Sequence, residues 1–318
     1  MPIESAPITT ELPTCLGIPS FAALRARAAQ GGRRRVAIVE AEDEIALTAA
    51  HDALKLGIAD PVLFGHSEEI RKYASSIRLY LEGITLVEAN SPEESARKAV
   101  EMVTAGEIEI LLKGHLRTDQ LLHAVLDKKT GLRTGRLLSD VLLYEDTLSG
   151  SRRLVAVTDG GLNVAPTLAQ KREIVMNAIE VLHALGIARP KIAIMSATES
   201  VTDSIPSTLD ARELTAMGER GEFGEAEVFG PLALDNALLL SAAQAKGITS
   251  PVAGFADCLV APNIEAGNFL GKAVKYLGGS QCAHVVVGAR VPILIPSRVE
   301  SADDKVNAIA LGAVYAAR

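Results

Sequence analysis

Short apolar runs alternate with longer segments of helical periodicity along most of the chain, beginning near residue 35. The runs, such as RVAIVE (35–40) and IEILLKG (108–114), are continuously apolar rather than alternately apolar and polar. Continuous runs are typical of strands that are buried on both faces of a mainly parallel sheet. Further strands are predicted at 61–65, 84–89, 138–146, 153–161, 191–197, 256–262 and 283–289.

The segments between these strands carry helix start and stop signals. In SPEESARKAVEMVTAG, Ser91 is a predicted N-cap, Pro92 takes the first helical position and Gly106 follows the last turn. Gly57 is a predicted C-cap, and Thr118 is predicted to cap the helix that begins TDQLL. Other helices are expected at 45–57, 167–185, 208–221, 231–247, 266–279 and 301–317.

This alternation predicts an α/β protein with either two sheets, or one long sheet and a cleft between two lobes. A chain of 318 residues suggests about two domains. The charged loop EDTLSGSRR (145–153) is the best single candidate for the boundary between them. In such folds ligands bind at the carboxyl ends of the strands.

The composition excludes several classes of function. Aromatic residues make up 3% of the chain, Trp is absent and the formal net charge is -7, which disfavours base stacking and phosphate-backbone binding. Cys15, Cys258 and Cys282 are too far apart for a disulfide framework or a zinc site. No apolar run reaches the roughly 20 residues of a membrane span, and the N-terminal segment lacks a secretory pattern. We therefore expect a cytoplasmic protein that binds neither nucleic acid, membrane nor metal.

Two junctions that follow predicted strands carry candidate chemistry. In TDGGLNVAP (158–166) the glycine pair would let backbone N–H groups approach a phosphate, although an ordinary turn is the more common reading. In LLKGHLRTDQLLH the cations Lys113, His115, Arg117 and His123 surround a helix start. An anion site and a solvated loop remain equal interpretations of this second junction.

Two later segments combine glycine, hydroxyl and charged groups. IEAGNFLGK places Gly267 and Asn268 at a predicted helix start, where simple capping is the favoured reading. PSRVESADDK places a hydroxyl and a guanidinium, which suit a phosphate, just before two acids. Acids at a helix start are also expected from the helix dipole, with Ser301 as N-cap. The residues alone leave a capped helix and an anion site open.

Taken together, these segments resemble the phosphate acetyl/butyryltransferase family. The resemblance runs from VAIVEAED through TDGGLNVAPTLAQKREIVMNAI, GPLALDNA and PNIEAGNFLGKAVKYLGG to VGARVPILIPSRVESADDK, roughly residues 35 to 318. The series GPLALDNA, AGN and PILIPSR is its most specific part.

The resemblance implies a two-lobed α/β fold of the isocitrate/isopropylmalate dehydrogenase type, with the active site in the cleft between lobes. Residues 1–150 and 285–318 would form the first lobe, including the C-terminal helix, and residues 151–284 the second. The implied reaction is acyl-CoA plus phosphate to acyl phosphate plus CoA, of the acetyl or butyryl type. A homodimer is implied, with CoA and phosphate as small-molecule substrates and no cofactor.

The resemblance also implies the site residues. Ser297, Arg298 and Asp304 match the family's catalytic positions, with Asp303 as the alternative base. The substrate site would be formed by Lys113, Gly114, Arg117, Thr118, His123, Gly267, Asn268, Gly288 and Arg298. The chain differs from the family's usual pattern at four positions, namely Arg117, His123, Asp140 and Phe229.

The implied chemistry needs a base for the CoA thiol. A thiol pKa of about 8.5 and an aspartate pKa of about 3.9 differ by roughly 4.6 units, or about 6 kcal/mol for complete proton transfer. A base at Asp304 would therefore need a raised pKa, from burial and from Asp303. Ser297 would donate a hydrogen bond to the oxyanion, and Arg298, with Lys113 or Arg117, would hold the phosphate.

Two other functions fit the same pattern. An oxidoreductase of this fold class would need a nicotinamide site and metal-binding aspartates, and no convincing set of them is found in the sequence. A non-catalytic acyl-CoA or acyl-phosphate binding protein would be compatible with the departures at His123 and Phe229. Phosphate-dependent or arsenate-dependent release of CoA distinguishes all three functions.

Overall fold

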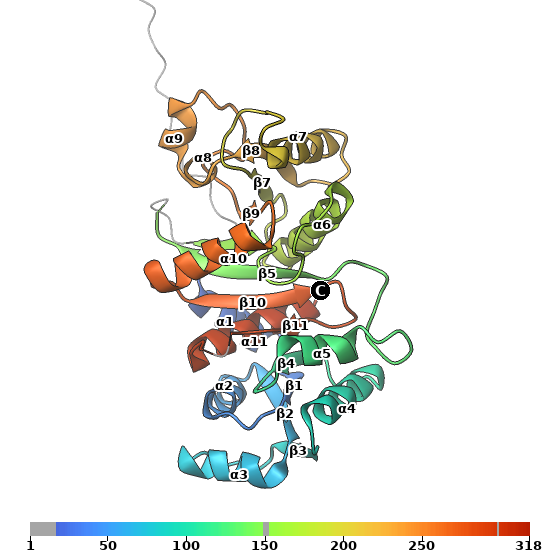
Figure 1. Ribbon diagram of the computed structural model, residues 1–318. Helices are drawn as coiled ribbons and strands as arrows, with labels where there is room; N and C mark the ends of the chain where they lie inside the picture. Colours follow the sequence, from blue (N-terminus) through green and yellow to red (C-terminus); the bar gives the residue numbers. More distant parts are fainter. Residues whose placement is uncertain (1–16, 149–152, 298) are drawn as a thin grey trace, which may run out of the picture.

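The computed structural model describes residues 17–148, 153–297 and 299–318, and its strands form one continuous eleven-stranded sheet (Figure 1). The strand order is β3-β2-β1-β4-β11-β10-β5-β6-β9-β7-β8. The strands are β1 (Arg34–Val39), β2 (Ala59–Gly65), β3 (Thr85–Glu88), β4 (Ile110–Lys113), β5 (Ser139–Asp146), β6 (Arg153–Thr158), β7 (Lys191–Met195), β8 (Glu227–Leu232), β9 (Cys258–Val260), β10 (Cys282–Val287) and β11 (Ile293–Leu294).

Helices cover both faces of this sheet. They are α1 (Phe21–Gln30), α2 (Glu44–Lys55), α3 (Ser67–Ser76), α4 (Pro92–Thr104), α5 (Thr118–Val125), α6 (Leu168–Ala184), α7 (Pro206–Glu219), α8 (Leu234–Leu238), α9 (Leu240–Ala245), α10 (Ile264–Lys272), the π-helical η1 (Ala273–Leu277) and α11 (Ala302–Ala316).

Antiparallel pairing in the centre of the sheet joins two parallel halves. β10 pairs antiparallel with both β5 and β11, and β5 pairs antiparallel with β6, whereas every other pair is parallel. The prediction of a mainly parallel α/β fold with flanking helices is confirmed, as one sheet rather than two. The predicted division at 145–153 falls between the paired strands β5 and β6, and its residues 149–152 lie outside the described residues. The lobe boundaries stay a prediction.

The two faces of the sheet are packed differently. On one face, a single apolar cluster runs along the sheet from Ile38 on β1 to Ile192 on β7, under α1, α2, α3, α6, α7 and α11. On the other face there are two separate clusters. One packs α4 and α5 against β1 and β4, and the other packs α8 and α9 against β6, β7 and β9. The strip of sheet between these two clusters is the place where a cavity can form.

Helix boundaries follow local chemistry at several predicted positions. Ser91 caps α4 with its hydroxyl, which accepts a hydrogen bond from the backbone N–H of Glu94, and Pro92 opens the helix. Ser301 is the N-cap of α11, because its hydroxyl accepts a hydrogen bond from the backbone N–H of Asp304. Gly57 follows α2 with φ +71, a conformation that favours glycine. The predicted cap at Thr118 was wrong by one residue, because α5 begins at Thr118 and Arg117 precedes it.

The segment expected to be one helix at 231–247 is instead a strand end and two short helices. Pro231 and Leu232 belong to β8, and α8 and α9 follow it. The expectation was wrong because a short apolar run such as PLAL is compatible with a buried strand as well as with a helix, and periodicity alone does not distinguish them.

Candidate active site

A cavity of about 500 Å³ lies over the centre of the sheet, between the two apolar clusters. Its floor follows from the strand register. Leu142 on β5 lies opposite His284 on β10 and opposite Val157 on β6, so the three side chains point to the same face. Asp140, two residues before Leu142, points the same way, and all four residues line the cavity.

The walls come from four segments. The end of β4 and the start of α5 contribute Lys113, Arg117 and Thr118. The turn after β6 contributes Gly160 and Gly161, and the residues that follow β11 contribute Pro296, Ser297 and Glu300. Helix α10, which lies in front of β5 in Figure 1, and the adjoining η1 supply the fourth wall.

This fourth wall is held to the β6 turn by close backbone packing. A Cβ atom at Gly267 would lie 2.6 Å from the carbonyl oxygen of Asp159, and one at Gly160 would lie 2.8 Å from the carbonyl carbon of Gly267. The side-chain amide of Asn268 donates a hydrogen bond of 3.1 Å to the carbonyl oxygen of Gly160. The glycines therefore let the turn and the helix approach each other, which places both at the cavity.

Six of the predicted site residues line this one cavity: Lys113, Arg117, Thr118, Gly267, Asn268 and Ser297. Two of them differ from the prediction in local structure. Gly267 and Asn268 do not open a helix, because α10 is capped by Asn263 and both residues lie within it. The prediction that these two residues cap a helix is therefore wrong. They contact the turn after β6 instead.

Two predicted glycines lie outside the cavity wall. A Cβ atom at Gly114 would lie 2.1 Å from the carbonyl oxygen of Glu40, and one at Gly288 would lie 2.3 Å from the carbonyl oxygen of Leu137. Gly288 also has φ +99. Both glycines allow close backbone packing, and neither is among the lining residues.

The structure does not bring His123 to the cavity. His123 lies on α5 and lines a separate cavity of about 490 Å³ between α4 and α5, together with Glu93, Arg97 and Gln120. The structure therefore separates His123 from the predicted substrate-site residues that share the first cavity, and its predicted role in substrate binding stays a prediction. The helical periodicity explains it, because His123 and Arg117 are six residues apart and face different directions.

Arg298 lies outside the described residues, so its predicted catalytic role stays a prediction. Asp303 and Asp304 are described, and neither lines the cavity. Asp303 is exposed and pairs with Arg25 at 3.0 Å.

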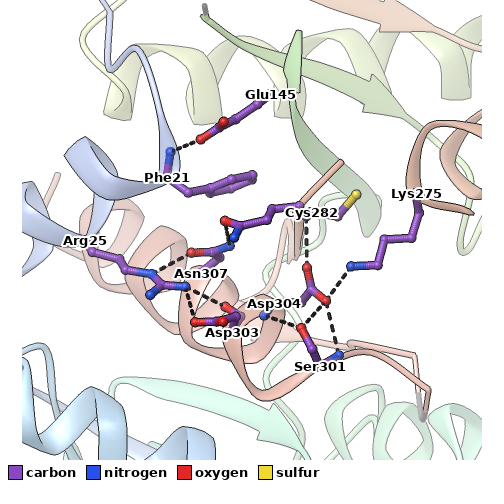
Figure 2. A network of polar contacts seen from close by, with 10 residues as sticks. Phe21, Arg25, Glu145, Lys275, Cys282, Ser301, Asp303, Asp304 and Asn307 are labelled. Carbon is purple, nitrogen blue, oxygen red and sulfur yellow. Dashed lines mark hydrogen bonds and ion pairs between the residues drawn. The ribbon is translucent and has the colours of Figure 1, made fainter. Parts of the chain in front are cut away.

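Asp304 is buried and its carboxylate has several partners (Figure 2). One oxygen accepts a hydrogen bond from the backbone N–H of Cys282 at 3.1 Å. The other accepts from the hydroxyl of Ser301 at 2.6 Å and pairs with the ammonium group of Lys275. Burial acts to raise the pKa of Asp304, but these contacts outweigh it and hold the pKa below its usual value. Asp304 therefore joins the start of α11 to η1 through Lys275 and to β10 through Cys282.

The cations of the cavity differ in how they are held. The buried Lys113 ammonium donates to the carbonyl oxygen of Leu116 at 3.3 Å. Arg117 is exposed, and its guanidinium donates to both oxygens of Asp119, at 3.0 and 2.8 Å. Lys272 and Lys275 line the opposite wall. The lysine and arginine side chains lie on two walls of the cavity and outnumber its carboxylates, Asp119, Asp140 and Glu300, by four to three, which favours an anionic ligand.

Eight charged or titratable residues of the cavity were not predicted as site residues: Asp119, Asp140, Lys272, Lys275, Tyr276, Cys282, His284 and Glu300. Nδ1 of His284 lies 3.1 and 3.2 Å from the carboxylate oxygens of Asp140, and its Nε2 lies 3.7 Å from Glu300. Burial acts to lower the pKa of His284, but the carboxylates of Asp140 and Glu300 outweigh it and raise the pKa to about 9. The available signal in the sequence was His284, a polar residue inside the apolar run AHVVVGA, whereas Asp140 lies in a strand with several other polar residues.

Within the described ranges, no group of three or more His, Cys, Asp or Glu side chains is arranged to hold a metal ion. No described helix is long and apolar enough to cross a membrane.

The structure shows an α/β protein with a cation-lined cavity over the centre of its sheet, and comparisons with known proteins identify its family. Residues 21–98 and 92–313 match the family model described as "Phosphate acetyl/butaryl transferase". The chain belongs to this family.

The chain is similar to curated phosphate acetyltransferases and to curated phosphate butyryltransferases. It is 42% identical over 276 residues to the phosphate acetyltransferase of Rhizobium meliloti, covering 87% of each chain. It is 41% identical over 283 residues to the phosphate butyryltransferase of Clostridium acetobutylicum, covering 89% of this chain and 93% of the relative.

Solved structures agree with this assignment. A branched-chain phosphotransacylase from Enterococcus faecalis V583 is 31% identical and superimposes with a TM-score of 0.78, covering 89% of this chain and 99% of the other. A 4-hydroxythreonine-4-phosphate dehydrogenase from Burkholderia phymatum is 14% identical, with a TM-score of 0.51 and coverage of 89% and 98%. The second likeness shows a shared dehydrogenase-like fold and nothing about activity.

Proposed function

We propose that this protein is a phosphate acyltransferase that interconverts acyl-CoA plus phosphate with acyl phosphate plus CoA. The observation that carries the proposal is the cavity, which combines the Ser297 hydroxyl with Lys113, Arg117, Lys272 and Lys275 in a member of the phosphate acetyl/butyryltransferase family. Both substrates are anionic, so a cavity with cations on facing walls suits them.

In the direction of acyl-CoA synthesis, the CoA sulfur attacks the carbonyl carbon of the acyl phosphate, and the phosphate leaves. The hydroxyl of Ser297 is the proposed donor to the carbonyl oxygen as negative charge develops on it. Lys113 and Arg117 are the proposed partners of the departing phosphate. For Arg117 this requires the guanidinium to exchange Asp119 for the ligand, at little cost because the pair is solvent-exposed.

The reaction as proposed uses CoA as a substrate and no further cofactor. The attacking group is a thiolate and the leaving group is a phosphate, so protein cations and hydrogen-bond donors suffice for the charges that develop.

The experiment is release of CoA from acetyl-, propionyl- and butyryl-CoA by the purified full chain, with phosphate and with arsenate. We expect release that depends on either anion and a preference for one acyl chain. Tight binding of acyl-CoA without any release would support a binding protein instead. Reduction or oxidation of a nicotinamide cofactor with a hydroxy-acid substrate would support an oxidoreductase.

We also propose a homodimer that works in the cytoplasm, as the family resemblance implies. Exposed apolar side chains on α10 and η1 support a protein interface, because Phe269 is 73% exposed, Tyr276 54% and Leu277 87%. Light scattering after size exclusion should give twice the 33.5 kDa mass of one chain. A monomer at micromolar concentration would contradict this proposal and leave the proposed reaction standing.

A further inference from the structure

His284 and Asp140 form a pair on neighbouring central strands, and both side chains line the active-site cavity. Nδ1 of His284 lies within 3.2 Å of both carboxylate oxygens of Asp140. A carboxylate only accepts hydrogen bonds, so Nδ1 carries a hydrogen. Nε2 is therefore the imidazole atom that can gain or lose a proton.

Nε2 faces a second carboxylate. Glu300 Oε1 lies 3.7 Å from it, which is beyond hydrogen-bond length but close enough to stabilise an imidazolium. The side chain of His284 is 20% exposed, against 3% for Asp140 and 6% for Glu300. Of the three groups, the imidazole therefore has the most access to the cavity.

The other candidate for a proton-transfer group is engaged elsewhere. Asp304 does not line the cavity, its two oxygens accept from Ser301 and Cys282, and its pKa is lowered. A carboxylate with a lowered pKa is further still from matching a thiol. Because Asp304 is not among the lining residues and its oxygens are already engaged, we infer that another residue takes the proton of the CoA thiol.

We propose that His284 exchanges the proton of the CoA thiol during acyl transfer, and that Asp140 and Glu300 are positioning residues for its two nitrogens. This inference rests on the proposed acyltransferase function and assigns a step within it.

In acyl-CoA synthesis the thiol proton passes from sulfur to Nε2 of neutral His284. The sulfur then forms a bond to the acyl carbon as the bond from that carbon to the phosphate oxygen breaks, and the phosphate carries the electron pair away. The imidazolium remains between Asp140 and Glu300. In the reverse direction phosphate attacks the thioester, and the imidazolium returns its proton to the departing thiolate, so atoms and charges balance.

The charges around the imidazole suit this exchange. Asp140 on β5, Glu300 before α11 and Asp304 on α11 all favour the imidazolium, and Lys275 on η1 offsets Asp304. Their balance raises the pKa of His284 to about 9, near the roughly 8.5 of a thiol, so proton transfer in either direction is close to even.

The test is the pH dependence of kcat for acyl-phosphate formation between pH 7.5 and 10, at saturating acyl-CoA and phosphate. The wild-type kcat should fall as His284 loses its proton near pH 9. His284→Gln should lower kcat by about 10²- to 10⁴-fold and remove the falling limb. Asp140→Asn should move the limb to lower pH, because the imidazolium loses a carboxylate, and a purely structural role for Asp140 would not shift it.

His183→Gln is the matched control, because His183 is an exposed histidine at the end of α6. It should keep both the wild-type kcat and the falling limb. Return of each sample to pH 7.5 should restore its activity, which separates titration from unfolding.

An independent readout is NMR of protein labelled with ¹⁵N-histidine. One of the six histidines should titrate near pH 9 in the wild type, and that signal should move to lower pH in Asp140→Asn. This measurement stands even if His284→Gln fails to fold.

A wild-type kcat and an unchanged pH limb in folded His284→Gln would overturn the inference and leave the proposed function standing. Absence of a histidine that titrates above pH 8 would overturn it as well. A wild-type protein without phosphate-dependent CoA release would instead overturn the proposed function.

Discussion

Ser297 is the cavity residue whose substitution should affect the transition state more than substrate binding. Its hydroxyl is the proposed donor to a charge that exists only during acyl transfer. Ser297→Ala should lower kcat by about 10²- to 10³-fold, with little change in the KM for acyl-CoA. Initial-rate kinetics with both substrates varied would check this, and a KM effect alone would assign Ser297 to substrate binding.

Asp304→Asn should affect stability through the contacts of Asp304 with Lys275, Ser301 and Cys282. The free energy of unfolding at pH 7 should fall by about 1.5–3 kcal/mol, as for hydrogen bonds to a charged group. Because the folded pKa is lowered, this stabilisation is present above the unfolded pKa of about 3.8 and is lost as pH falls through the folded pKa. Urea unfolding from pH 7 to pH 3 should show the wild type and the variant converging.

The adjacent residue supplies the control for this experiment. The side chain of Asp303 is 65% exposed and pairs with Arg25 at the surface, so Asp303→Asn should change stability by less than about 1 kcal/mol. Equal effects of the two substitutions would contradict the role assigned to Asp304.

At the scale of elements, the packing of α10 against the β6 turn depends on glycine. Gly267→Ala should lower stability by about 1–3 kcal/mol, because the added methyl group meets the backbone carbonyl of Asp159, which cannot move aside cheaply. Gly271→Ala on the same helix is the control. Its Cβ would lie 3.1 Å from a terminal methyl of Leu142, which can rotate, so the gain in helix propensity should leave stability unchanged or slightly raised. Thermal unfolding of both variants tests this difference, and equal losses would contradict it.

The elements were largely predictable from the sequence, and the register between them was not. Apolar runs located the strands because a strand buried on both faces must be apolar, and Ser91, Pro92 and Ser301 marked helix starts by their own local chemistry. His284 and Asp140 are 144 positions apart and meet only because β10 inserts beside β5. No local pattern in one sequence encodes that pairing, so this part of the site was missed.

His123 shows a related limitation of sequence analysis, because residues that are close in sequence can line different cavities. Its proximity in sequence to Lys113 and Arg117 suggested one site, but the turn of α5 directs it to the cavity beside α4. The six predicted residues that do meet in the cavity came from three separate segments, which the family resemblance, rather than spacing, connected.

At the scale of the whole molecule, one apolar cluster joins the two halves of the sheet. It extends without interruption from β1 and β4 through β5 and β10 to β7. We expect heat or urea to unfold the protein in a single cooperative transition, with equal calorimetric and van't Hoff enthalpies. Two resolved transitions would show that the halves separate before either unfolds.

The central position of β10 and β11 has a consequence for biosynthesis. Both strands are made after β1 to β9, yet they occupy the sheet between β4 and β5. Until they are translated, β4 and β5 each present an unpaired edge, which is a template for pairing with another chain. Nascent chains that stall before residue 282 should therefore aggregate or engage chaperones, and the floor of the candidate active site should form only when the last strands enter the gap.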